Sequence, residues 1–269
     1  MSSDHADPIS SPRRRGSASS ILTRLGWRLR STLSPERRAT VRRATDPLVG
    51  PLGSIRGAKT DVAVALTFDD GPGPATPGVL DALADFGATA TFFVLVPHAE
   101  AHPEIVRRMI DEGHEVALHG VDHRRLPSLP PKDVRPHIAE GKRRLEACTG
   151  EPVHLFRPPY GSQTPRTFAD ARRCGLTVTV WSSDADDWID HTATEIAFLA
   201  VDRVVPGGVL LLHDRFVSDP SAPLPEPNFD RAEVVELTLA GLRRRGLTGC
   251  SVRDLVGQGR ARRTAWFRM

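Results

Sequence analysis

Short apolar runs alternate along the chain with longer segments in which apolar residues recur every three or four positions. The short runs predict buried strands, and the longer segments predict helices with one apolar face. The expected strands are residues 62–68, 89–96, 115–118, 153–156, 176–181, 209–212 and a short strand near Ser251. The expected helices are residues 77–86, 102–112, 132–148, 165–174, 194–205 and 231–245. Thr76, which precedes Pro77, is expected to cap the first of these helices.

This alternation predicts an α/β fold in which helices connect parallel strands. Seven or eight units of strand and helix fit a (β/α) barrel better than an open sheet. We expect the barrel domain to span residues 57–257. A basic, partly disordered tail and linker is expected over residues 1–56, and a C-terminal tail over residues 258–269.

Residues 1–50 differ in composition from the rest of the chain. They hold ten arginines, no lysine and four acidic residues, a net charge of +6, whereas the whole chain carries +3. The remaining residues therefore carry −3, and the basic pI gives no reason to expect nucleic-acid binding by the folded part. Residues 21–43 fit either a basic amphipathic helix on an anionic membrane surface or a short helix or mobile arm beside the domain.

Cysteine spacing and apolar run length bear on location. Cys148, Cys174 and Cys250 are too widely spaced for a metal knuckle or a disulfide framework, which favours a reducing compartment. No run approaches the ~18 apolar residues of a membrane span. Residues 13–15 resemble a twin-arginine signal, but further arginines interrupt the segment that should be apolar. We expect a cytoplasmic monomer, with peripheral membrane contact through the basic tail as an open alternative.

Five polar clusters follow directly after five of the predicted strands. They are Asp69-Asp70, His119 to His123, Arg157 to Gly161, Asp184 to Trp188 and His213-Asp214. The C-terminal ends of the strands of a parallel barrel share one face. Each cluster alone has an ordinary structural explanation, but their shared position predicts one functional site.

Two of these clusters predict a metal site. His119 and His123 are four residues apart, so one turn of helix or a tight loop places both imidazoles on the same side. One carboxylate from Asp69-Asp70 completes a ligand set that leaves a metal position open for water or substrate. One divalent ion is expected there, and zinc suits the set best. Because side chains alternate along a strand, the two aspartates should point in different directions, one toward the metal and one toward a proton.

The other clusters supply groups for hydrolysis. His213 is placed to protonate a leaving group, and the neighbouring carboxylate of Asp187 would keep it charged. Arg157 is expected to hold a carboxylate through both arms of its guanidinium group. Trp188 and Tyr160 offer faces for a sugar ring, although each could equally be ordinary packing.

In this order, the clusters resemble the five motifs of the polysaccharide deacetylase family, the NodB-like carbohydrate esterases. The matching residues are 67–72, His119-x-x-x-His123, Arg157-Pro158-Pro159-Tyr160-Gly161, Asp184-x-x-Asp187-Trp188 and Leu211-x-His213. The resemblance covers about residues 60–256. It implies a distorted (β/α) barrel, the NodB homology domain, that uses a divalent metal, usually zinc, to remove N-acetyl or O-acetyl groups from sugars.

The resemblance also implies a role for each matching residue. The metal ligands would be Asp70, His119 and His123. The base would be Asp69, oriented by Arg157, and the acid would be His213, tuned by Asp187. The main-chain N–H of Tyr160 would help to hold the oxyanion, and Leu211 and Trp188 would line the pocket for the acetyl methyl group. Gly120 departs from the family pattern, in which Ser or Thr usually steadies the loop between the ligands.

The substrate is less well defined by the sequence. The chain has one tyrosine and four tryptophans, and this small number favours a short acetylated sugar over a long polysaccharide. The long segment 216–229 after the last cluster is expected to shape the pocket. Two alternatives are a deacylase or deformylase of a lipid-linked amino sugar or a non-sugar amide, and a catalytically silent carbohydrate-binding barrel. Retention of base, acid and ligands argues against the silent barrel.

Overall fold

The computed structural model describes residues 53–220 and 222–268. The expected basic tail and amphipathic helix therefore lie outside the described residues. No helix in the described part of the chain combines the length and the apolar character needed to cross a membrane.

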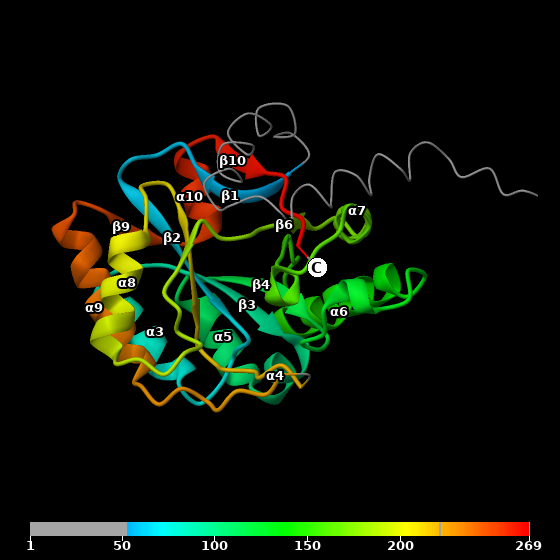
Figure 1. Ribbon diagram of the computed structural model, residues 1–269, viewed down its shortest axis with the longest axis horizontal. Coiled ribbons are helices and arrows are strands. Elements are labelled where there is room, and N and C mark those ends of the chain that lie inside the picture. The colour runs from blue at the N-terminus through cyan, green and yellow to red at the C-terminus, as the bar shows by residue number, and fades with distance from the viewer. Residues whose placement is uncertain (1–52, 221, 269) are drawn as a thin grey trace, which may run out of the picture. The chain divides into compact units, whose positions relative to one another are not determined.

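Eight parallel strands form the central sheet. They are β2 (Ala63–Asp69), β3 (Thr91–Leu95), β4 (Glu115–Gly120), β5 (Leu155–Phe156), β6 (Thr177–Val178), β7 (Ser183–Asp184), β8 (Val209–His213) and β9 (Thr248–Cys250). Their order is β6-β5-β4-β3-β2-β8-β7, and β9 pairs with the start of β2. The sheet curls without pairing β6 to β7, which confirms the expected distorted (β/α) barrel (Figure 1).

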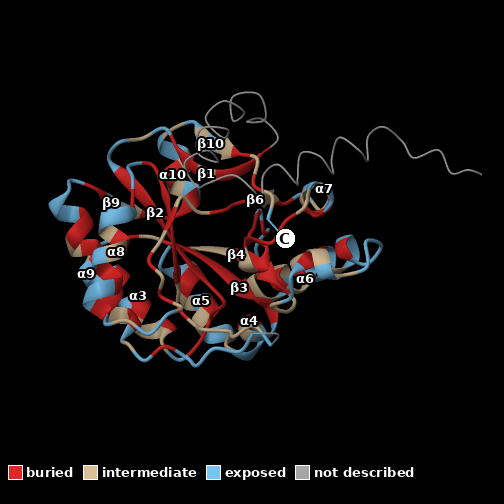
Figure 2. Ribbon diagram, in the orientation of Figure 1, coloured by how far each residue is buried: buried red, intermediate tan, exposed pale blue. Residues whose placement is uncertain are grey.

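Helices cover the outer face of this sheet (Figure 1). They are α3 (Thr76–Asp85), α4 (Val96–Ala101), α5 (Pro103–Asp111), α6 (Val134–Thr149), α7 (Pro165–Arg173), α8 (Ala193–Arg203) and α9 (Arg231–Arg244), whereas α10 (Val252–Gln258) packs on the inner side of the sheet. The short 3₁₀ helices η2 (Leu126–Ser128) and η3 (Pro159–Gly161) lie in loops. Figure 2 shows buried strands in the centre and exposed residues on the outer helices.

The structure corrects three local expectations. Thr76 is the first residue of α3 and not its cap, because its hydroxyl group donates a hydrogen bond to Asp214 (2.5 Å) and accepts one from the Gly73 N–H (2.8 Å). The strand expected over residues 176–181 is divided into β6 and β7. Helix α4 precedes the expected helix over residues 102–112.

A second, two-stranded sheet joins the two ends of the described chain. Strand β1 (Ser54–Ala58) runs antiparallel to β10 (Ala261–Thr264), and Ser54 lies opposite Thr264. Residues expected to form a C-terminal tail therefore contain a strand, and β1 begins before the expected domain boundary at residue 57. The periodicity of such short strands is too brief to predict them from sequence.

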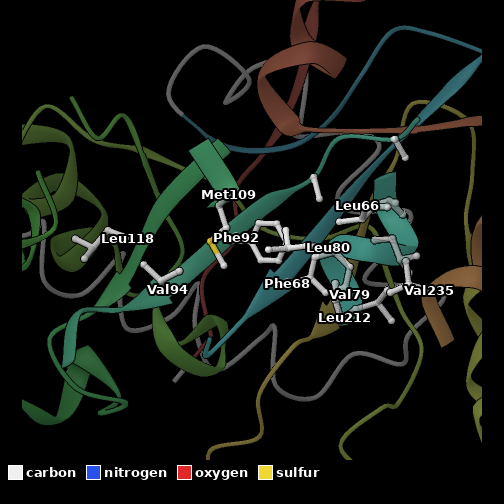
Figure 3. Close-up of a cluster of buried hydrophobic side chains, with 14 of the residues drawn as sticks. Leu66, Phe68, Val79, Leu80, Phe92, Val94, Met109, Leu118, Leu212 and Val235 are labelled. Carbon is white, nitrogen blue, oxygen red and sulfur yellow. The ribbon is translucent and has the colours of Figure 1, made fainter. Parts of the chain in front are cut away.

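Two apolar clusters occupy the two faces of the curled sheet. The outer cluster joins strand residues such as Phe68 and Phe92 to Leu80 and Val235 of the helices (Figure 3). The rings of Phe68 and Phe92 stack with centroids 5.1 Å apart. The inner cluster takes the alternate strand positions, Ala65 among them, together with side chains of β1 and α10. Strand alternation therefore divides the sheet into a helix-facing side and an inner side.

We expect Phe92→Ala to destabilise the protein by about 3–5 kcal/mol, because it leaves a cavity in the packed core. The wild-type Phe92 side chain is 0% exposed. The matched control is Phe198→Ala on α8, where the ring is 67% exposed and the change should stay within about 0.5 kcal/mol. Urea unfolding followed by circular dichroism measures both values. Equal losses in the two variants would contradict this account of the core.

Candidate active site

Strand alternation brings the predicted site residues to the inner side of the barrel. Asp69 at the end of β2 continues the inner face that includes Ala65, and His213 at the end of β8 continues the face that includes Val209. A cavity of about 430 Å³ opens at these strand ends. Eight of the ten predicted residues line it, namely Asp69, Asp70, His119, His123, Tyr160, Trp188, Leu211 and His213. The other two, Arg157 and Asp187, are buried behind the lining residues that they contact.

Asp70 turns toward the same cavity as Asp69, which corrects the expectation that the two aspartates point apart. Asp70 is the first residue beyond β2, and its φ of 74° lies in the left-handed region. Such a conformation costs a non-glycine residue about 1–3 kcal/mol and persists only where the surroundings hold it. Strand alternation therefore stops at Asp69, and both carboxylates face one cavity.

Asp70, His119 and His123 bring three potential ligand atoms together within 4.8 Å of one another. Asp70 Oδ1 lies 3.3 Å from His119 Nε2 and 3.2 Å from His123 Nε2, yet it is buried without a hydrogen-bond partner. Burial by itself would raise the pKa of Asp70, but the neighbouring imidazoles lower it to about 2. Burial lowers the pKa of His123 to about 4, although Asp70 opposes this shift. The cluster therefore combines an ionised carboxylate with a neutral imidazole.

The tautomer of His119 follows from its second ring nitrogen. Its Nδ1 lies 2.9 Å from the carbonyl oxygen of Arg157, which can only accept a hydrogen bond, so Nδ1 carries the hydrogen. In the neutral ring, the lone pair of Nε2 then faces Asp70 Oδ1. Two facing acceptors repel each other unless a cation lies between them. A histidine that donates its other N–H to a carbonyl is typical of metal sites, so these residues fit a divalent ion.

The loop between the two histidines is a tight loop and not a helical turn. Gly120 ends β4 with a φ of 156°, and a Cβ at this position would lie 2.8 Å from the Asp122 carbonyl oxygen. The serine or threonine usual in the family would not fit this conformation. The loop still places the His119 and His123 rings 5.4 Å apart, so the departure at Gly120 leaves the expected ligand pair together.

Arg157 holds Asp69 through one arm of its guanidinium group, and not through both as expected. Its Nη1 donates to Asp69 Oδ1 at 2.6 Å and to Thr67 Oγ1 at 2.9 Å. The guanidinium also lies over the Phe93 ring, 4.0 Å from its centroid, and the side chain is fully buried. The other oxygen of Asp69, Oδ2, therefore faces the cavity and lies 3.9 Å from His119 Nε2.

His213 is held by Asp187, and on the adjacent strand β8 it is the register partner of Asp69. Its Nδ1 lies 2.8 Å from Asp187 Oδ1, and its main-chain N–H donates to Asp187 Oδ2 at 2.7 Å. Burial alone would lower the pKa of His213, but the Asp187 carboxylate, followed by those of Asp70 and Asp69, raises it to about 9. The Trp188 ring stands perpendicular to the imidazole with centroids 5.9 Å apart. The contact with Asp187 therefore favours the imidazolium form of His213.

Tyr160 lies in η3 and lines the cavity. Its φ is 58°, and its ring lies 4.3 Å from that of His123. The Arg125 guanidinium lies over the same ring, 3.9 Å from its centroid. The ring thus packs against His123 and also lines the cavity, so its expected role as a face for a sugar stays a prediction.

Several cavity residues were not predicted individually. The expectation that segment 216–229 shapes the pocket holds, because five of its residues line the cavity, namely Phe216, Val217, Asp219, Ala222 and Leu224. The Val217 N–H also donates to Asp70 Oδ2 at 3.2 Å. Arg125, Trp181 and Arg268 line the cavity from segments whose local pattern carries no sign of a site.

Comparison with known proteins gives a consistent family assignment. A sequence profile described as polysaccharide deacetylase matches residues 56–179. A chitooligosaccharide deacetylase from Sinorhizobium fredii is 39% identical over 154 residues, which cover 56% of this chain and 72% of that protein. A peptidoglycan-N-acetylglucosamine deacetylase from Bacillus cereus is 35% identical with the same coverage. A family 4 carbohydrate esterase from Streptomyces lividans, solved with acetate, superposes with a TM-score of 0.61 at 28% identity, covering 71% of this chain and 92% of that one.

We expect Asp187→Asn to lower the pKa of His213 from its raised value, because a neutral amide no longer stabilises the imidazolium. NMR titration of the histidine ring signals of the metal-free protein measures this pKa. The matched control is Asp184→Asn, since Asp184 lines the same cavity but accepts its hydrogen bond from Trp181 Nε1. A His213 pKa that stays near 9 in Asp187→Asn would contradict the assigned cause.

Proposed function

The chain belongs to the polysaccharide deacetylase family, and on that premise we propose that it removes the acetyl group from a short acetylated sugar with the help of one divalent metal ion. Both the chitooligosaccharide and the peptidoglycan relatives are carbohydrate deacetylases by name. The amide of an N-acetylated sugar is the proposed bond, and zinc is the proposed ion because it suits two histidines and one carboxylate best. An O-acetyl ester is the alternative substrate of the same site.

One observation carries the proposal. A cluster of three lone-pair donors, Asp70, His119 and His123, shares one cavity with a carboxylate held by an arginine and an imidazole held by a carboxylate. This arrangement supplies both a base and an acid beside the cluster. A barrel that only bound sugars would have no use for a proton donor beside a metal site.

When bound at these residues, the ion supplies a Lewis acid that lowers the pKa of water and polarises the acetyl carbonyl group. Asp69 accepts the proton of the attacking water through Oδ2, the oxygen that Arg157 leaves uncovered. The main-chain N–H of Tyr160 donates to the carbonyl oxygen as it gains negative charge. His213 then gives its proton to the leaving nitrogen as the carbon–nitrogen bond breaks.

The residues that form the wall of the cavity favour a short substrate. Arg125 from the loop after β4 lies 3.2 Å from Asp219 in the loop after β8, so this ion pair bridges two loops at the cavity. The same wall carries the apolar side chains of Phe216, Val217 and Leu224. Leu211 and Trp188 line the part of the cavity beside His213 and are the proposed surface for the acetyl methyl group.

The first test of this proposal measures metal binding. We expect His119→Ala and His123→Ala each to weaken Zn²⁺ binding by more than about 100-fold, because loss of partners outside the ligand set already costs about 10–100-fold. Isothermal titration of chelator-treated protein measures the affinity. His137→Ala is the matched control, since His137 lies 3.4 Å from Asp122 and does not line the cavity. Stoichiometric zinc in the doubly substituted protein would rule out the ligand set.

The second test separates base from acid. We expect Asp69→Asn to retain zinc and to lose roughly 10²–10⁴-fold in kcat, the usual contribution of a positioned base. His213→Ala should also retain zinc and should slow an N-acetyl sugar more than an aryl acetate, because a phenolate leaves without protonation. Since the acid acts in its protonated form, kcat/KM should fall as pH rises through the His213 pKa, and His213→Ala should flatten this alkaline limb.

Acetate release from N-acetylglucosamine oligomers and from an aryl acetate measures both rates. Equal slowing of the two substrates by His213→Ala, with an unchanged alkaline limb, would assign the acid role to another group. Full activity of the Asp69→Asn variant would show that Asp69 is not the base.

A further inference from the structure

The end of the described chain packs against the turn that contains Tyr160. Gln163, just after this turn, forms two main-chain hydrogen bonds with Arg268, of 2.6 and 2.9 Å. The Gln163 side chain donates to the carbonyl oxygen of Trp266 at 2.7 Å. The indole N–H of Trp266 in turn donates to the Gly161 carbonyl oxygen at 2.9 Å. Residues more than 100 positions apart are thus joined by four hydrogen bonds.

Gly161 is packed closely between two indole rings. Trp181 and Trp266 lie with ring centroids 5.0 Å apart. A Cβ atom at Gly161 would lie 2.7 Å from Trp181 Cη2 and 3.2 Å from Trp266 Nε1, so no larger residue fits there without a shift. Gly161 also has a φ of 60°, which a glycine adopts without strain. The turn therefore has little room to move on this side.

This support matters because Tyr160 is strained. A tyrosine with a φ of 58° keeps its conformation only when its surroundings hold it. The turn itself contributes two hydrogen bonds, from the Gly161 N–H to Pro158 O and from the Ser162 N–H to Pro159 O. Trp266 adds a hydrogen bond to the peptide group of Gly161, directly after Tyr160.

We propose that Trp266 is a positioning residue for the deacetylation reaction. Its indole holds the Gly161 carbonyl and, together with Trp181, keeps the Tyr160 turn in the conformation that presents the Tyr160 main-chain N–H to the reacting carbonyl. The proposal rests on the function proposed above. Trp266 itself does not line the cavity, so it acts on the rate through the turn and not on substrate binding.

The test compares Trp266→Phe with Phe267→Leu in the full-length, zinc-loaded protein. Trp266→Phe keeps an aromatic ring but removes the N–H donor. Phe267→Leu is the matched control, because Phe267 follows Trp266 in the chain but its ring contacts the ring of Phe168 in α7. The two ring centroids are 6.4 Å apart. Gln163→Met is a second route, since it removes the side-chain hydrogen bonds to Trp266 O and Ser54 Oγ without changing either indole. Hydrogen exchange of the peptide covering residues 160–162 reports on the turn independently of activity.

We expect Trp266→Phe to lower kcat by roughly tenfold, because a misplacement of about 1 Å at a reacting group can cost about 10²-fold. KM and zinc content should stay close to wild type, and exchange at residues 160–162 should become faster. Gln163→Met should change kcat and exchange in the same direction, whereas Phe267→Leu should change neither.

Unchanged kcat and exchange in Trp266→Phe would overturn the proposal, and so would an equal loss of kcat in Phe267→Leu. A wild-type protein without any deacetylase activity would instead refute the proposed function. In that case, hydrogen exchange would still decide whether Trp266 holds the turn.

Discussion

The buried contact between Arg157 and Asp69 is the interaction on which the site depends most. The Arg157 side chain reaches from the end of β5 to the proposed base on β2, and the main-chain oxygen of Arg157 accepts a hydrogen bond from the Nδ1–H of His119. One residue thus orients both the base and a proposed metal ligand. Breaking a buried ion pair by removing one partner costs about 3–5 kcal/mol, because a charge is left without compensation. The same contact therefore ties the geometry of the site to the stability of the barrel.

Strain is concentrated where the proposed chemistry takes place. Asp70 and Tyr160 both have positive φ values, and both lie beside His123 in the cavity. Each conformation is held by partners from distant segments, including the Val217 N–H for Asp70 and the Trp266 indole for the turn of Tyr160. Functional groups in such conformations keep their positions without reorganisation when charge develops in the reaction. The surrounding fold supplies the stabilisation that the local sequence lacks.

Two ionisable groups of the cavity are held by different partners. Asp69 forms an ion pair with a buried arginine. His213 is paired with Asp187, and this carboxylate, with Asp70 and Asp69, raises the pKa of His213 to about 9. Both Asp69 and His213 line one cavity of about 430 Å³. This division suits a base and an acid that must act on the same bond.

Much of the fold and most of the candidate site followed from the sequence. Alternating apolar runs predicted the parallel strands, and the polar clusters behind them predicted the residues that converge, because strand ends of one barrel share a face. Local pattern could not predict the left-handed turn at Asp70, the single bond from Arg157 to Asp69 or the two-residue strands β6 and β7. It also missed the pairing of β1 with β10 and the contact of Trp266 with Gly161. These features depend on contacts between segments far apart in the chain, and only the tertiary structure determines which distant partners meet.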